Sequence, residues 1–225
     1  MRRCLRAVIF DFDGTLVDSL DAFVEAMAAA VKALGLPPVS RERLAELVRL
    51  PADQSLPMLV PSSLNDKSLV ERLVSEYRRA YSKLHLRLVR PVPGICSVLR
   101  GLKEAGFSIA VITRRRLMTA HVREELEFLG LNGFVDVLAT YDTVQSANTK
   151  LDLAVECLRK LKLKGGECAV VGDSPEDIEV GKRLKALTIG VLYGFHSKEE
   201  IISCNPHFTA ERSTEILRIL FQYKP

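Results

Sequence analysis

The chain has 225 residues, of which 48% are hydrophobic and 27% are charged, and its formal net charge is +4. This length allows one domain with a substantial core plus a modest insertion, and the composition excludes a disordered or fibrous protein. The positive charge is mild and dispersed, so we expect no nucleic-acid partner, and no apolar run is long enough to span a membrane.

The first predicted element is a buried parallel strand, Ala7-Val8-Ile9-Phe10. Asp11 and Asp13 follow at its C-terminal end, which is where open α/β sheets bind ligands. Gly14 then allows a sharp turn and a close approach of the backbone to a ligand. The two carboxylates repel each other, so the pair needs a cation or a shared proton. A divalent metal would meet that need, and the arrangement then suits nucleophilic attack on a phosphorus ester.

A helical pattern replaces the strand pattern after Ser19. Three helices are predicted, over residues 20–34, 40–48 and 66–85, and no strand pattern interrupts them. We therefore expect a helical insertion over 19–88 within a core formed by 1–18 and 89–225. Hinge-like segments, 17–19 and 90–94, mark the two crossings between these parts.

Strands and helices alternate in the rest of the chain, which predicts parallel βαβ units and an α/β fold. The expected strands cover 107–112, 134–138, 168–171 and 187–192, and the expected helices cover 95–105, 117–129, 151–161 and 175–185. A late segment, 207–209, is expected to add an edge strand. Ser213 is expected to cap a final helix.

Four segments in chain order resemble the motifs of the haloacid dehalogenase-like hydrolases. The first runs from Asp11 to Ser19, and the second is Thr113 at the end of a hydrophobic strand. The third is Lys150 at a helix start, and the fourth is Gly-Asp173 with Asp177 four residues later. Their order and spacing argue against coincidence. The resemblance covers nearly the whole chain and implies a Rossmann-like parallel-sheet core with an inserted helical cap.

The resemblance also implies a role for each acidic residue and for the lysine. Asp11 would attack phosphorus to form an aspartyl-phosphate, while Asp13 would protonate the leaving oxygen and then activate water. Mg²⁺ would be held by the Asp11 carboxylate, the Asp13 backbone carbonyl and Asp173. Lys150, supported by Asp177, would neutralise charge on the nucleophile and the transferring group. For Asp177 a plain helix-capping role is an alternative, because Ser174-Pro-Glu-Asp is a good helix start.

The substrate-binding set implied by the resemblance is Gly14, Thr113, Arg114 and Lys150. Thr113 and backbone N–H groups after Asp11 would hold the phosphoryl oxygens. Arg114 departs from the family, in which an Asn is common at this position, and we expect it to face an anionic substrate or the cap. For Arg115 and Arg116 a solvated turn and a functional role remain equally open. A compensating anion is expected because three arginines precede a predicted helix.

The function implied is a magnesium-dependent phosphatase for a small phosphorylated metabolite, similar to phosphoglycolate phosphatases. Phosphosugar mutases of the β-phosphoglucomutase type keep the same two aspartates and a cap, so a mutase is the first alternative. A non-catalytic metabolite-binding relative is the second, although it would be expected to have lost an essential group. Dehalogenase and phosphonatase branches fit less well because they lack an acid at the position of Asp13.

The cysteines and the N-terminus bear on location. Five cysteines, Cys4, Cys96, Cys157, Cys168 and Cys204, are widely spaced and form no CxxC pair, which predicts reduced thiols. The apolar run behind the basic start is too short for a signal peptide. We therefore expect a cytoplasmic protein. A monomer or homodimer is expected. Arg49 lies where relatives place a substrate-specificity loop, and a surface arginine is the favoured interpretation.

Overall fold

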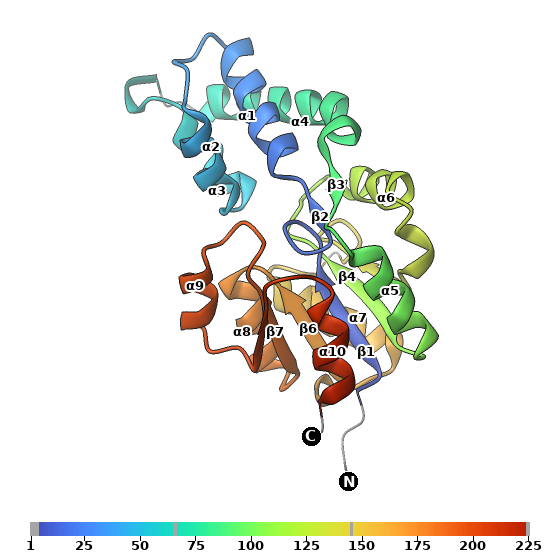
Figure 1. The fold of residues 1–225 in the computed structure, drawn as a ribbon. Coiled ribbons are helices and arrows are strands. Elements are labelled where there is room, and N and C mark those ends of the chain that lie inside the picture. The colour runs from blue at the N-terminus through green and yellow to red at the C-terminus, as the bar shows by residue number, and fades with distance from the viewer. Residues whose placement is uncertain (1–4, 65–66, 145, 224–225) are drawn as a thin grey trace. The chain divides into compact units, whose positions relative to one another are not determined.

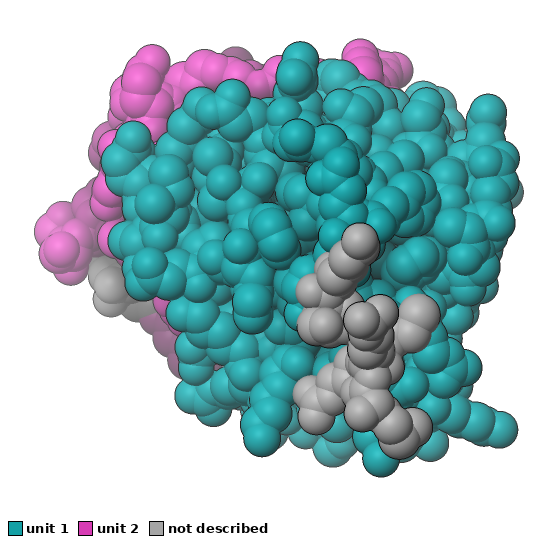
Figure 2. All heavy atoms as spheres, turned by 60° about the horizontal axis from the view of Figure 1, so that its bottom comes forward, with its two compact units in different colours: residues 1–18, 91–225 teal, residues 19–90 magenta. Residues whose placement is uncertain are grey.

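The computed structural model describes residues 5–64, 67–144 and 146–223 (Figure 1). The chain forms two compact units, residues 1–18 with 91–225 (unit 1) and residues 19–90 (unit 2), which Figure 2 distinguishes by colour. The chain crosses between the units at two short strands, β2 (Val17–Asp18) and β3 (Arg90–Pro91), which pair with each other. No helix in the described ranges combines the length and apolarity needed to cross a membrane.

Unit 1 contains a six-stranded sheet with the order β5-β4-β1-β6-β7-β8, in which every pairing is parallel. The strands are β1 (Ala7–Asp11), β4 (Ser108–Ile112), β5 (Val137–Ala139), β6 (Cys168–Gly172), β7 (Leu187–Val191) and β8 (Phe208–Ala210). All five residues of β1 are buried, as expected for a central strand covered on both faces. The predicted α/β class is confirmed.

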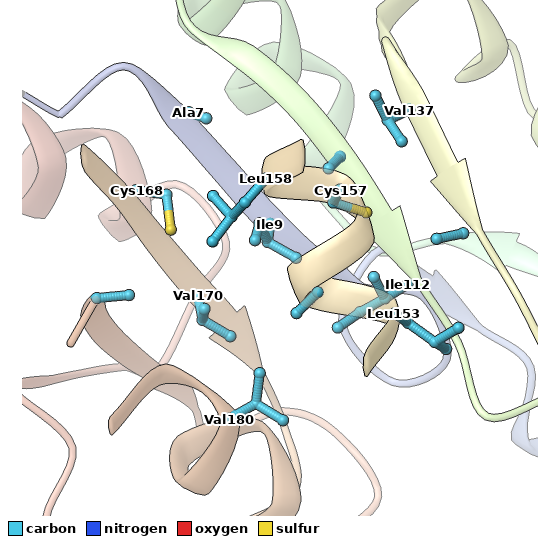
Figure 3. Close-up of a cluster of buried hydrophobic side chains, with 14 of the residues drawn as sticks. Ala7, Ile9, Ile112, Val137, Leu153, Cys157, Leu158, Cys168, Val170 and Val180 are labelled. Carbon is cyan, nitrogen blue, oxygen red and sulfur yellow. The ribbon is translucent and has the colours of Figure 1, made fainter. Parts of the chain in front are cut away.

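Helices cover both faces of this sheet (Figure 1). On one face α7 (Lys150–Leu161) and α8 (Pro175–Arg183) enclose a core to which β1, β4 and β6 contribute Ile9, Ile112 and Val170 (Figure 3). On the other face α5 (Ile95–Glu104) packs against β4 and against α10 (Glu215–Gln222). The remaining helices of unit 1 are α6 (Thr119–Phe128), α9 (Lys198–Ser203), η3 (Asn132–Phe134) and η4 (Gly165–Glu167).

Unit 2 is helical. It contains α1 (Leu20–Ala33), α2 (Arg41–Val48), α3 (Ala52–Ser55), η1 (Pro57–Leu59), η2 (Ser62–Leu64) and α4 (Lys67–Leu88). Helices α1 and α4 pack together through Phe23 and Tyr81, whose rings stack 5.2 Å apart. Ser40 caps α2 as expected, because its Oγ accepts a hydrogen bond from the Arg43 N–H at 3.2 Å. The third predicted helix of the insertion was expected to start at Asp66, which lies outside the described residues.

Several predicted boundaries were wrong for local reasons. Residues 132–134 form a 3₁₀ turn, so the strand expected from 134 begins at Val137. The helix expected from Leu117 begins at Thr119, because Leu117 has a φ of 55°.

Ser213 does not cap α10, since its Oγ donates to the Pro93 carbonyl at 2.5 Å. Helix α9 was not predicted, although Ser197 and Glu200 form a capping box at its start.

Four cysteines fall in the described ranges, Cys96, Cys157, Cys168 and Cys204, and all four are free thiols. Cys4 lies outside those ranges. Burial raises the pKa of both Cys157 and Cys168 to about 12, so they are protonated at neutral pH and pack as small hydrophobic side chains.

Candidate active site

The predicted motif residues meet at the C-terminal edge of the sheet in unit 1. Asp11 ends β1, Thr113 follows the end of β4, and Asp173 follows the end of β6. These three strands are adjacent, with β1 in the centre. After β5 the chain returns to the other side of β1, so the edge is the switch point at which α/β sheets bind ligands.

Lys150 occupies the first position of α7 and connects two buried carboxylates. Its Nζ lies 2.6 Å from Asp11 Oδ1 and 2.7 Å from Asp177 Oδ1. The lysine side chain is 1% exposed. Burial alone would lower the pKa of Lys150, but Asp11 and Asp177 raise it above its ordinary value. Lys150 is therefore a permanent positive charge beside Asp11.

Asp177 performs the structural and the electrostatic role at once. Its Oδ2 accepts hydrogen bonds from the Ser174 N–H and hydroxyl at the start of α8, while Oδ1 faces Lys150. Ser174 returns the bond by accepting from the Asp177 N–H, which completes a capping box. The contacts are those of a helix cap and also those of a partner for Lys150, whose role in catalysis stays a prediction.

Asp173 lies in a cradle made by two glycines. Its Oδ2 accepts from the Phe195 N–H at 2.7 Å, and its Oδ1 accepts from the Thr15 hydroxyl at 3.2 Å. A Cβ on Gly14 would lie 2.5 Å from Asp173 Oδ2, and a Cβ on Gly194 would also overlap this side chain. Gly14 has a φ of +77°, and its N–H donates to the Val17 carbonyl. Gly14 thus provides space for Asp173, and its part in substrate binding stays a prediction.

The buried acids carry more negative charge than their neighbours balance. One oxygen each of Asp11, Asp173 and Asp177 lie within 4.8 Å of one another, and Lys150 is the cation that contacts two of them. Burial raises the pKa of Asp11 well above its ordinary value, against the opposing effect of Lys150, and burial also raises the pKa of Asp173 to about 6. A divalent cation fits this site, because Mg²⁺ prefers carboxylate oxygens and would offset the excess charge. The family resemblance implies Asp11 and Asp173 as the carboxylate ligands, whereas Asp177 starts α8 and contacts Lys150.

The raised pKa of Asp173 predicts a pH-dependent response to Mg²⁺. Protonated Asp173 is favoured in the metal-free fold, so its contribution to stability is complete below the ordinary pKa of 3.8 and is lost as pH rises through about 6. Above that pH the carboxylate is free to bind metal. We expect Mg²⁺ to raise the melting temperature more at pH 7.5 than at pH 5, as measured by calorimetry.

The isosteric variant Asp173→Asn provides the control, because its amide does not titrate. Without metal, the variant should gain stability relative to the wild type as pH rises from 4 to 7. A Mg²⁺ shift of equal size at both pH values, or one that the variant retains in full, would contradict the assignment.

The second aspartate, Asp13, contacts residues that follow β4. The Thr113 hydroxyl donates to Asp13 Oδ2 at 3.3 Å and accepts from the Arg115 N–H at 3.2 Å. The Arg115 guanidinium contacts both Asp13 oxygens and also pairs with Glu125 of α6. Arg115 is buried, so a solvated turn is the wrong description of this residue.

One feature of the sequence could have indicated the Arg115 contact. Glu125 falls on the buried face of α6, between Val122 and Leu126, where an acid requires a buried partner. Of the other two arginines, Arg114 meets a compensating anion as expected, because its Nε lies 3.7 Å from Glu176 Oε2. Arg116 instead lies over the Tyr141 ring at 3.9 Å.

Comparison with known proteins decides the family. The family model described as haloacid dehalogenase-like hydrolase matches residues 8–191. A phosphoglycolate phosphatase of Vibrio parahaemolyticus is 31% identical over 96% of both chains. The chain belongs to the haloacid dehalogenase-like hydrolase family. The membership expected from the four motifs is confirmed.

Two further relatives show how far the similarity extends. The pyrophosphatase PpaX of Halalkalibacterium halodurans is 26% identical over 96% of this chain and 97% of its own length. The crystal structure of a protein described as a predicted phosphoglycolate phosphatase from Haemophilus somnus superposes with a TM-score of 0.85, at 22% identity, and covers 96% of this chain and 97% of that one. The structural match shows that the two proteins share one fold over nearly all of both chains.

Proposed function

We propose that this hydrolase is a magnesium-dependent phosphatase that acts on a small phosphorylated metabolite through an aspartyl-phosphate on Asp11. The observation that carries this proposal is the 2.6 Å contact between Lys150 Nζ and Asp11 Oδ1, which joins the end of β1 to the start of α7. A buried carboxylate held beside a fixed cation is suited to attack an anionic phosphoryl group, because the lysine offsets the repulsion between them.

The reaction divides into two displacements at phosphorus. In the first, an Asp11 oxygen forms a bond to phosphorus, the ester P–O bond breaks, and Asp13 gives a proton to the leaving oxygen. In the second, Asp13 takes a proton from water, the water oxygen bonds to phosphorus, and the Asp11–phosphorus bond breaks. Lys150 and the Thr113 hydroxyl hold phosphoryl oxygens, and Asp177 keeps Lys150 in place.

Magnesium, held by the Asp11 and Asp173 carboxylates and the Asp13 backbone carbonyl, would neutralise charge on the phosphoryl group. The cradle around Asp173 supports this assignment because it holds an oxygen of this carboxylate within 4.8 Å of one from Asp11. Unit 2 would serve as the cap, since it is an all-helical insertion between the first and second motifs. Cytoplasmic location and a monomeric or homodimeric state remain predictions.

The substrate class follows from the chemistry shared by the named relatives. The relatives are named for activity on phosphoglycolate and on pyrophosphate. Both compounds carry a second anionic group close to the reacting phosphoryl group. Arg114 adjoins Thr113 and its side chain is 27% exposed, so it can meet such a group. We propose a substrate with a second negative charge, either carboxylate or phosphate.

Replacing Arg114 tests this substrate class. Arg114→Ala should raise KM for an ester with an anionic tail by about tenfold, the low end of the effect of a charge-assisted hydrogen bond. An ester with a neutral tail should be little affected. Steady-state kinetics on both esters gives the comparison, and equal effects on the two would place Arg114 on the phosphoryl group instead.

Glu176→Gln is the matched variant for Arg114. It removes the negative partner at 3.7 Å and leaves the arginine in place, so KM for the anionic ester should fall rather than rise. A rise in KM for this variant would mean that Glu176 orients Arg114 toward the substrate rather than competing with it.

Activity itself is tested by a panel of phosphorylated metabolites with Mg²⁺, in which released phosphate is measured alongside isomerised sugar phosphate. We expect phosphate release, with 2-phosphoglycolate and pyrophosphate among the better substrates. Isomerisation of a sugar phosphate without net phosphate release would favour the mutase. No turnover of any ester would favour a binding protein.

A further inference from the structure

Arg115 connects the proposed acid–base residue to a buried glutamate. Its Nε and Nη2 donate to the two oxygens of Asp13 at 2.9 and 2.6 Å. Its Nη1 and Nη2 donate to the two oxygens of Glu125 at 2.8 and 3.0 Å. Four of the five N–H bonds of the guanidinium are therefore directed at two carboxylates.

This cluster is almost completely removed from solvent. The Arg115 side chain is 4% exposed and the Glu125 side chain is fully buried, whereas Asp13 is 16% exposed. Buried ion pairs of this kind rarely add stability over apolar side chains of similar size, because the charges lose their hydration. The arrangement does fix the position of the guanidinium. Phe12 also contacts it, since Arg115 Cζ lies 5.0 Å from the centre of the Phe12 ring.

We infer that Arg115 is a positioning residue that fixes the orientation of the Asp13 carboxylate, with Glu125 of α6 holding Arg115 in turn. The inference rests on the proposed phosphatase function, in which Asp13 must reach the leaving oxygen and later a water molecule from one place. Two parallel hydrogen bonds prevent the carboxylate from rotating about its Cβ–Cγ bond. A misdirected carboxylate loses most of its value in proton transfer, because transfer requires hydrogen-bond contact.

The same segment also places the phosphate-binding hydroxyl. The Arg115 backbone N–H donates to Thr113 Oγ1, which itself contacts Asp13. One short stretch after β4 thus sets both the group that would hold a phosphoryl oxygen and the group that would protonate the leaving oxygen. Lysine could supply the charge at this position, but it lacks the planar fork that sets orientation.

The test compares leaving groups in the first displacement alone. With enzyme in excess over ester and Mg²⁺ present, the single-turnover rate of leaving-group release reports the step in which Asp13 donates its proton. An alkyl phosphate from the substrate panel needs that proton, whereas 4-nitrophenyl phosphate releases a stable anion without it. We expect Arg115→Lys to slow release from the alkyl ester about 100-fold and release from the nitrophenyl ester less than about fivefold.

A second variant guards against misfolding. Arg115→Met combined with Glu125→Leu removes the guanidinium without leaving Glu125 buried and unpaired, while Asp13 is 16% exposed and keeps its contact with the Thr113 hydroxyl. This double variant should slow leaving-group release from the alkyl ester selectively, as Arg115→Lys does. Combining it with Asp13→Asn should slow release from the alkyl ester no further, because all these changes remove the same function. Arg116→Ala, which alters the neighbouring arginine over Tyr141, should leave the ratio between the esters unchanged.

Each other outcome overturns the inference. Equal slowing of both esters would assign Arg115 a general structural role, and wild-type ratios in Arg115→Lys would show that charge alone suffices. Faster release in either variant would make Arg115 a restraint on Asp13 rather than a support. A wild-type protein that hydrolyses no ester would overturn the proposed function together with the inference, whereas an active wild type with unselective variants would overturn the inference alone.

Discussion

Asp11→Asn is expected to abolish phosphate release, with kcat reduced by about 10⁶, the scale seen when a covalent nucleophile is removed. The amide oxygen is a poor nucleophile and a weaker metal ligand. The fold should survive, because Lys150 keeps Asp177 at 2.7 Å. Since burial raises the pKa of Asp11, the metal-free variant no longer has to hold a buried charge there and should melt no lower than the wild type.

The control for Asp11→Asn is the same chemical change on the surface of unit 1. Glu179→Gln on α8 removes a carboxylate that is 58% exposed and pairs with Arg183. It should leave kcat unchanged. A rate for Asp11→Asn within tenfold of the wild type would exclude an aspartyl-phosphate at this residue.

Lys150→Met is expected to damage both activity and stability. Methionine fills the space but leaves Asp11 and Asp177 without their buried cation, which costs about 3–5 kcal/mol when one partner of a buried pair is lost. Loss of a charge that stabilises the transition state should lower kcat by a factor of about 10²–10³. Urea unfolding and steady-state kinetics measure the two effects separately.

Lys160→Met is the matched change on the same helix. Lys160 is 41% exposed and lies 3.8 Å from Glu156, so removing it should alter stability by less than about 1 kcal/mol. Mg²⁺ should recover part of the stability lost in Lys150→Met, because the divalent ion supplies positive charge to the same carboxylates. Equal destabilisation by both lysine variants would mean that Lys150 is not the counter-ion that the structure shows.

The parts of the fold that the sequence predicted are those set by local pattern. The apolar run from Ala7 to Phe10 identified β1, and period 3.6 identified the helices of the insertion. The position of Asp11 at the ligand-binding edge followed from a general rule, because it ends a parallel strand. The meeting of Lys150 and Asp173 with Asp11 was implied by the family resemblance.

What could not be predicted depends on contacts between distant segments. Three consecutive arginines look alike in sequence, yet Arg115 is buried against Asp13 while Arg114 and Arg116 meet Glu176 and Tyr141. Serine is a common helix-capping residue, yet the Ser213 hydroxyl donates a hydrogen bond to the Pro93 carbonyl, 120 residues away in the chain. Neither outcome follows from propensity, because tertiary partners decide which hydrogen bond a side chain makes.

The double use of Asp177 limits how this enzyme can change. The carboxylate that starts α8 is also the one that faces Lys150, so a substitution that improved helix initiation would alter the charge balance, and the reverse also holds. Replacing Asp177 with glutamate would preserve the charge, but the longer side chain would displace Ser174 or Lys150. Gly172 also packs closely against Asp177, since a Cβ on Gly172 would overlap the Asp177 side chain. A laboratory selection for thermal tolerance would therefore find few acceptable replacements at this position and should gain stability from surface positions far from the sheet edge.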